Sequence, residues 1–92
     1  MTAREFAQAA YDYALNQSEK YNIDFDLIKV DRNKSRADEE YYYMVDIYYK
    51  LYDEKAIEVN GFFKDRYTQE YMQKNFDEIK EFVNNIVKEH AL

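Results

Sequence analysis

The chain has 92 residues with 13 basic and 19 acidic side chains, which gives a formal net charge of −6. Its length supports one domain over residues 1–92, because a core divided in two would bury too little apolar surface in each half. The negative charge repels a phosphate backbone, so we expect no direct binding of duplex DNA. The sequence has no cysteine, which excludes disulfides and thiolate zinc sites and favours a reducing compartment.

Apolar residues are numerous but never continuous enough for a membrane span, which needs roughly 20 of them in a row. We also find no secretory signal at the N-terminus. These patterns predict no membrane association and a cytoplasmic location. The 11 Tyr and 6 Phe side chains are the large groups from which a small domain can build a core.

The first predicted element is a helix over residues 3 to about 20. Thr2 and Glu5 have the spacing of a capping box, in which each side chain binds the backbone N–H of the other residue. Residues at three- and four-residue intervals then form a narrow stripe with many small side chains. They are Ala3, Phe6, Ala7, Ala10, Tyr13, Ala14 and Gln17.

A strand is predicted from Ile23 to Asp31, where Ile23, Phe25 and Leu27 alternate with polar residues. Ile28 and Val30 then fall on the opposite parity. Either both faces of the strand are covered beyond Leu27 or a bulge resets the alternation, and the sequence leaves both alternatives open.

Residues 31–40 contain no strongly apolar side chain, so we expect them to form the longest loop. Asp31, Asn33 and Ser35 have the spacing of the first calcium ligands, but Arg36 occupies the required glycine position and Tyr42 the position of the bidentate glutamate. The match to a calcium loop therefore fails. Arg32, Lys34 and Arg36 could form a secondary contact with RNA, although a solvated hairpin loop is the preferred interpretation.

Two further strands are predicted at 41–52 and 55–64, joined by a turn at Asp53 and Glu54. The first is rich in aromatic and β-branched residues, and its odd positions should form the core. These positions are Tyr41, Tyr43, Val45, Ile47, Tyr49 and Leu51. Gly61, the single glycine of the chain, marks a bulge or a close backbone approach.

A C-terminal helix is predicted over 68–90, with Thr68 as its cap. Its apolar stripe comprises Met72, Phe76, Ile79, Val83, Ile86 and His90, widened by Phe82 and Val87. Asn75 and Glu78 form a second capping signal, which suggests that the helix breaks near residue 75.

The element order predicts an α+β two-layer domain: a helix, a three-stranded antiparallel meander and a C-terminal helix. If both helices cover the odd face of the sheet, the even face is left bare. We predict that a partner binds this even face. Its predicted contact residues are Tyr42, Met44, Asp46, Tyr48, Tyr52, Glu58 and Phe62, together with Asp24 and Asp26.

Catalytic residues are not apparent in the sequence. His90 is best explained as a cation at a helix C-terminus. The carboxylate pairs Asp24/Asp26 and Glu39/Glu40 could hold magnesium, but alternating acids are usually a solvated surface. One glycine cannot build a phosphate-binding loop. We therefore expect no enzyme, no cofactor and no metal.

In size, acidity, lack of cysteine and proline, and element order the whole chain resembles phage-encoded anti-CRISPR proteins. The resemblance implies a stoichiometric inhibitor without a cofactor, which blocks a Cas effector complex by occupying its basic nucleic-acid-binding surface. The resemblance carries over no binding residues. The alternatives are an immunity protein for a basic nuclease toxin and a homodimeric structural or adaptor domain.

Overall fold

Two helices and three strands follow one another in the predicted order. The computed structural model describes residues 1–34, 41–51 and 55–90, with the side chains of 31–34 left out of the description. The elements are α1 (Ala3–Tyr21), β1 (Phe25–Lys34), β2 (Tyr41–Lys50), β3 (Ala56–Lys64) and α2 (Gln69–His90). The strands form one antiparallel sheet in the order β1-β2-β3. The predicted α+β fold is confirmed.

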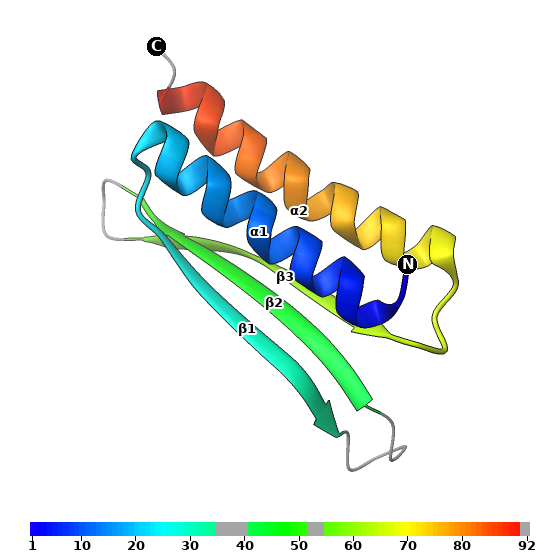
Figure 1. The fold of residues 1–92 in the computed structure, drawn as a ribbon. Helices are drawn as coiled ribbons and strands as arrows, with labels where there is room; N and C mark the ends of the chain where they lie inside the picture. Colours follow the sequence, from blue (N-terminus) through cyan, green and yellow to red (C-terminus); the bar gives the residue numbers. More distant parts are fainter. Residues whose placement is uncertain (35–40, 52–54, 91–92) are drawn as a thin grey trace.

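Both helices lie on the same face of the sheet, side by side and with their N-terminal ends at the same end of the molecule (Figure 1). α1 contacts all three strands, whereas α2 contacts β3 and α1. The described helices therefore form one layer and leave the opposite face of the sheet uncovered. Neither described helix is long and apolar enough to cross a membrane.

α1 packs closely on the sheet because its buried stripe consists mainly of small residues: Ala3, Phe6, Ala7, Ala10 and Ala14. The predicted capping box is present. The Glu5 N–H donates to Thr2 Oγ1 at 3.2 Å, and the Thr2 N–H donates to Glu5 Oε1 at 3.0 Å. These hydrogen bonds to Thr2 lower the pKa of Glu5 below its ordinary value. Asn22, in the left-handed conformation at φ 53°, ends the helix.

The core lies between the helices and the odd face of the sheet, as predicted. Tyr43, Val45 and Ile47 of β2 are buried there. They pack with Phe25, Phe63 and the apolar stripe of α2, which includes Met72, Ile79 and Val83. Tyr49 is half-buried beside this core, while Tyr41 at the start of β2 is 46% exposed and does not belong to it. Leu51 follows the end of β2 and is half-buried.

β1 differs from its prediction in its bounds. It begins at Phe25 and extends to Lys34, so residues 31–34 lie in the strand and not in the loop. Pairing with β2 is unbroken from Phe25 to Val30, and the irregularity comes afterwards, between Val30 and Asn33. Polar residues can continue an antiparallel ladder because its hydrogen bonds use the backbone alone. The rest of the predicted loop, residues 35–40, lies outside the described residues.

α2 is one continuous helix from Gln69 to His90, so the break suggested near residue 75 is wrong. The Asn75 amide is occupied elsewhere, since its Nδ2 donates to the Phe62 carbonyl oxygen of β3 at 3.4 Å. Thr68 does cap the helix, because its Oγ1 accepts from the Tyr71 N–H at 3.1 Å. The predicted cap was therefore right at Thr68, and Asn75 has a tertiary role that capping rules do not foresee.

Gly61 is a point of close approach and not a bulge. It pairs with Val45 in an unbroken β2–β3 register. A Cβ built at Gly61 would overlap Ile79 Cδ1 of α2 and would lie 3.0 Å from Phe63 Cε2. Ile79 and Phe63 are fully buried, so neither can move aside freely. The absence of a side chain at Gly61 thus lets α2 seat on β3.

We therefore predict that Gly61→Ala lowers the free energy of unfolding by about 1 to 3 kcal/mol through overpacking. Ile79→Val removes the clashing Cδ1 atom and by itself should cost about 1 kcal/mol. In the Gly61→Ala background it should cost less or restore stability. Denaturant unfolding of the two single variants and the double variant measures this coupling, and strictly additive effects would contradict it.

Candidate protein-binding face

The face of the sheet opposite the helices, here called the bare face, consists of five cross-strand rows. The register sets these rows as Lys50–Ala56, Asp26–Tyr48–Glu58, Ile28–Asp46–Asn60, Val30–Met44–Phe62 and Tyr42–Lys64. Because side chains alternate along each strand, all these residues project away from the helix layer. The register thus places the even-numbered contact residues of β2 and β3 on one surface.

One end of the bare face is apolar and aromatic. Val30, Met44 and Phe62 form a row across the three strands, and Ile28 stands next to it. Ile28 is 42% exposed and Phe62 37% exposed. The Tyr42 ring stacks on Phe62 with 4.7 Å between ring centroids and 19° between planes. This end therefore offers a contiguous apolar surface held in a fixed geometry by cross-strand contacts.

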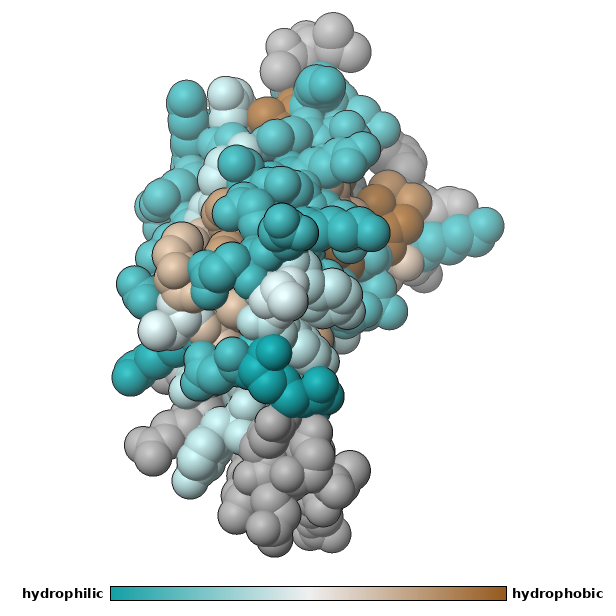
Figure 2. Space-filling view, turned by 90° about the vertical axis from the view of Figure 1, so that its right-hand side faces the viewer, coloured by the Kyte–Doolittle hydropathy of each residue, from teal (hydrophilic) through white to brown (hydrophobic). Residues whose placement is uncertain are grey.

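Large apolar side chains are also exposed elsewhere on the described surface, among them Met1, Tyr21 and Tyr71. Seen from the side that lies at the right of Figure 1, most of the visible surface is hydrophilic, and hydrophobic residues appear in a few separate groups (Figure 2). The apolar row of the bare face differs from separate groups of this kind, because Val30, Met44 and Phe62 are cross-strand neighbours. Exposed apolar patches of this kind are typical of interaction sites.

The middle of the bare face is polar, and its buried carboxylate already has a hydrogen-bond partner within the sheet. Asp46 is 7% exposed, between Ile28 on β1 and Asn60 on β3. The Asn60 amide donates to Asp46 Oδ1. The Asp46 carboxylate thus belongs to the sheet, and its substitution would leave the Asn60 amide without this partner.

The other end of the bare face is acidic. Asp24, Asp26, Tyr48, Lys50 and Ala56 line a hollow of about 420 Å³ that is open to solvent. Asp24 and Asp26 are exposed. The structure therefore brings the two predicted aspartates next to Tyr48.

The ionisation of the Tyr48 hydroxyl is shifted by its position on this face. Its pKa is raised above the ordinary value, chiefly because the ring is partly removed from water and then because of the nearby Asp46, Glu58 and Asp26 charges. Its hydroxyl also forms a hydrogen bond with the Glu58 carboxylate. These causes hold Tyr48 in the neutral form, with a polar tip among carboxylates.

Other predicted contact residues are placed less fully. Tyr52 and Arg36 lie outside the described residues. For Arg32 and Lys34 the structure gives the backbone alone, at the end of β1. The secondary RNA contact proposed for this segment remains a prediction.

Several residues that the register places on the bare face were not predicted as contacts: Ile28, Val30, Lys50, Ala56, Asn60 and Lys64. For Ile28 and Val30 the signal was the shift in parity after Leu27, which left a second covered face and a bulge as open alternatives. In the structure the pleat continues normally through Val30, and the two apolar residues simply face the uncovered side. The shift marks the point at which the apolar end of this face begins.

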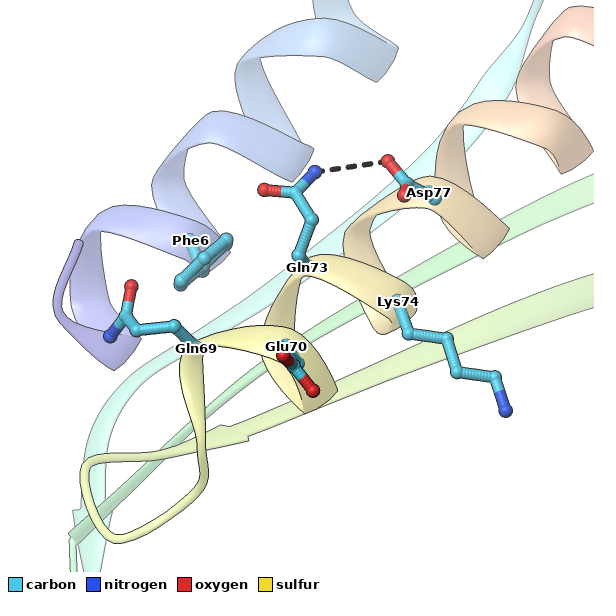
Figure 3. Close-up of a pocket in the computed structure, with 6 residues that line it drawn as sticks. All are labelled: Phe6, Gln69, Glu70, Gln73, Lys74 and Asp77. Atoms are coloured by element: carbon cyan, nitrogen blue, oxygen red, sulfur yellow. Dashed lines mark hydrogen bonds between the residues drawn. The ribbon is translucent and has the colours of Figure 1, made fainter.

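Another hollow, of about 490 Å³, lies between the N-terminal halves of the two helices. Figure 3 shows Phe6 of α1 pointing toward α2, with polar side chains of α2 around it. Phe6 is 2% exposed, and Gln73 Nε2 already donates to Asp77 Oδ1 at 3.0 Å. The polar side chains that line this groove are exposed side chains of α2, and its one aromatic member is buried, so it is a weaker candidate than the bare face.

His90 lies in the last turn of α2, as predicted. Its Nε2 is 2.5 Å from the Tyr49 hydroxyl, and its ring meets the Tyr49 ring edge-on. Within the described residues no three His, Asp or Glu side chains come together as a metal site.

Comparison with protein-family models, curated proteins and solved structures finds no match.

We predict that Glu58→Gln lowers the pKa of Tyr48 toward its ordinary value, because it removes one carboxylate charge. A raised pKa means that the folded state holds the tyrosine proton more tightly than the unfolded state does. The raised pKa therefore contributes to the free energy of unfolding. This contribution is fully present below pH about 10 and is lost as the pH rises through the raised pKa. Titration of ring-labelled tyrosine by NMR measures the shift. Glu81→Gln on α2 is the matched control, and an unchanged Tyr48 titration in Glu58→Gln would contradict the assignment.

Proposed function

We propose that the chain is a small binding protein that docks a basic surface of another protein onto the bare face. By covering that surface it would inhibit a complex that handles nucleic acid. The observation that supports the proposal is an uncovered sheet face with an apolar and aromatic end beside an acidic end. The proposal needs no cofactor and no catalytic group.

The two ends of the bare face can serve different steps of binding. Met44 and Phe62 provide apolar area that a partner can bury, with Tyr42 stacked beside them. Asp26 and Glu58 are exposed, so they can attract a basic partner and orient it during encounter. When the partner is bound, carboxylates of the sheet can occupy the positions on the partner that phosphates of DNA or RNA would otherwise occupy.

The resemblance to phage anti-CRISPR proteins is the ground for naming the partner more narrowly. On that reading the partner is a Cas ribonucleoprotein, and the chain competes for its nucleic-acid-binding surface. An immunity protein against a basic nuclease would need the same surface chemistry. The neighbouring genes, a phage cluster or a toxin gene, separate these two partners.

Affinity capture from the native host tests the docking face. A tagged chain with Asp26→Lys and Glu58→Lys should lose the partner that the unchanged chain retains, because both exposed charges are reversed. Tyr48→Ala should weaken retention as well. Asp46 is left unchanged, since its carboxylate is buried and bonded within the sheet.

The matched control reverses two exposed charges of α2, Glu81→Lys and Glu89→Lys. This variant has the same net charge as the double variant of the bare face and should retain the partner. The captured partner should also bind labelled nucleic acid less tightly when the unchanged chain is added. Equal loss in both charge variants, or undiminished nucleic-acid binding, would contradict the proposal.

A further inference from the structure

We infer that the element which occupies the bare face is a single amphipathic helix of the partner, with basic residues about two to three turns beyond its apolar residues. This inference rests on the proposed function and adds the kind of structure that is bound. It follows from the dimensions of the face, from its charges and from the way in which the opposite face is covered.

The width of the bare face matches one helix. Strands in a sheet lie about 4.8 Å apart, so the outer strands of this sheet are roughly 10 Å apart, close to the diameter of a helix. On the opposite face α1 contacts all three strands, and α2 adds contacts with β3. One helix is thus sufficient to cross the whole width of this sheet.

The length of the bare face sets the spacing of the partner's side chains. The apolar row at Met44 and the acidic row at Tyr48 are four residues apart along β2, which corresponds to about 13 Å. A helix that lies along the strands rises 1.5 Å per residue and covers this distance in about nine residues. The helix positions that bracket this distance and return to the same face are seven and eleven residues further along. With apolar side chains on the row of Met44, cations at those positions lie near Asp26 and Glu58.

The face presents side chains and not a free backbone edge, because the backbone groups of β2 are paired on both sides. An added strand would have to pair at β1 or β3 and would not cover Met44. A second copy of the chain is disfavoured by charge, since each copy carries −6 and an exposed acidic row. A basic helix satisfies both the shape and the charge.

The test uses the full chain with ¹³C-labelled methionine methyl groups. The sequence has three methionines, of which Met44 lies on the bare face, Met72 is 1% exposed in the core and Met1 is 55% exposed at the N-terminus. The probe is an alanine-rich helical peptide with two leucines one turn apart and two arginines seven and eleven residues after the first leucine, positions that return to the leucine face because a helix has 3.6 residues per turn. One control peptide carries glutamates in place of the arginines, and another carries the arginines on the face opposite the leucines.

The first peptide should shift the Met44 signal saturably and leave Met1 and Met72 unchanged. Binding should weaken in higher salt, because exposed charges are screened, and most of it should be lost in the variant with Asp26→Lys and Glu58→Lys. The control with Glu81→Lys and Glu89→Lys should bind as the unchanged chain does. An unmoved Met44 signal at millimolar peptide, or equal binding of any control peptide, would overturn the inference.

Two further outcomes separate this inference from the proposed function. If host-partner capture depends on Asp26 and Glu58 but the first peptide does not bind, the docking face stands and the helical occupant is wrong. If the Met44 signal moves with the concentration of the chain alone, a second copy occupies the face and the helix is wrong again.

Discussion

The rest of this structure depends on the close packing of α1 on the sheet. Its buried side chains are mostly alanines, so the helix axis can lie near the strands and cross all three of them. α2 is then placed beside α1, over β3, where the missing side chain of Gly61 gives room to Ile79. Both helices occupy one face, and the bare face is the direct consequence.

The composition of the bare face shows why such a surface is tolerated in an isolated chain. In the middle of the face the Asp46 carboxylate accepts a hydrogen bond from the Asn60 amide. At the apolar end the aromatic rings of Tyr42 and Phe62 stack on each other. The acidic end keeps charge exposed at Asp26 and Glu58. The apolar end is therefore bordered by polar groups, a pattern that suits reversible binding more than a permanent core.

Much of the fold follows from the sequence, because the periodicity of apolar residues identifies the buried face of a helix or strand. The alternation of β2 predicted its buried side, and the Thr2 capping box predicted the start of α1. The same reasoning failed where contacts are tertiary. Asn75 has the pattern of a cap but donates to β3, and Asp46 has the pattern of a surface charge but is covered by its neighbours. Ile28 and Val30 were ambiguous because alternation alone does not tell an uncovered apolar side from a covered one.

The central claim is that the partner covers the bare face and not the helix layer. Since the chain has no cysteine, one introduced thiol reports on one position. The rate of thiol labelling should be measured for Phe62→Cys on the bare face and for Tyr71→Cys on α2, each with and without the captured partner. The account predicts that the partner strongly slows labelling at position 62 and leaves position 71, where the native tyrosine is 51% exposed, unchanged. Protection at position 71 with none at position 62 would contradict it.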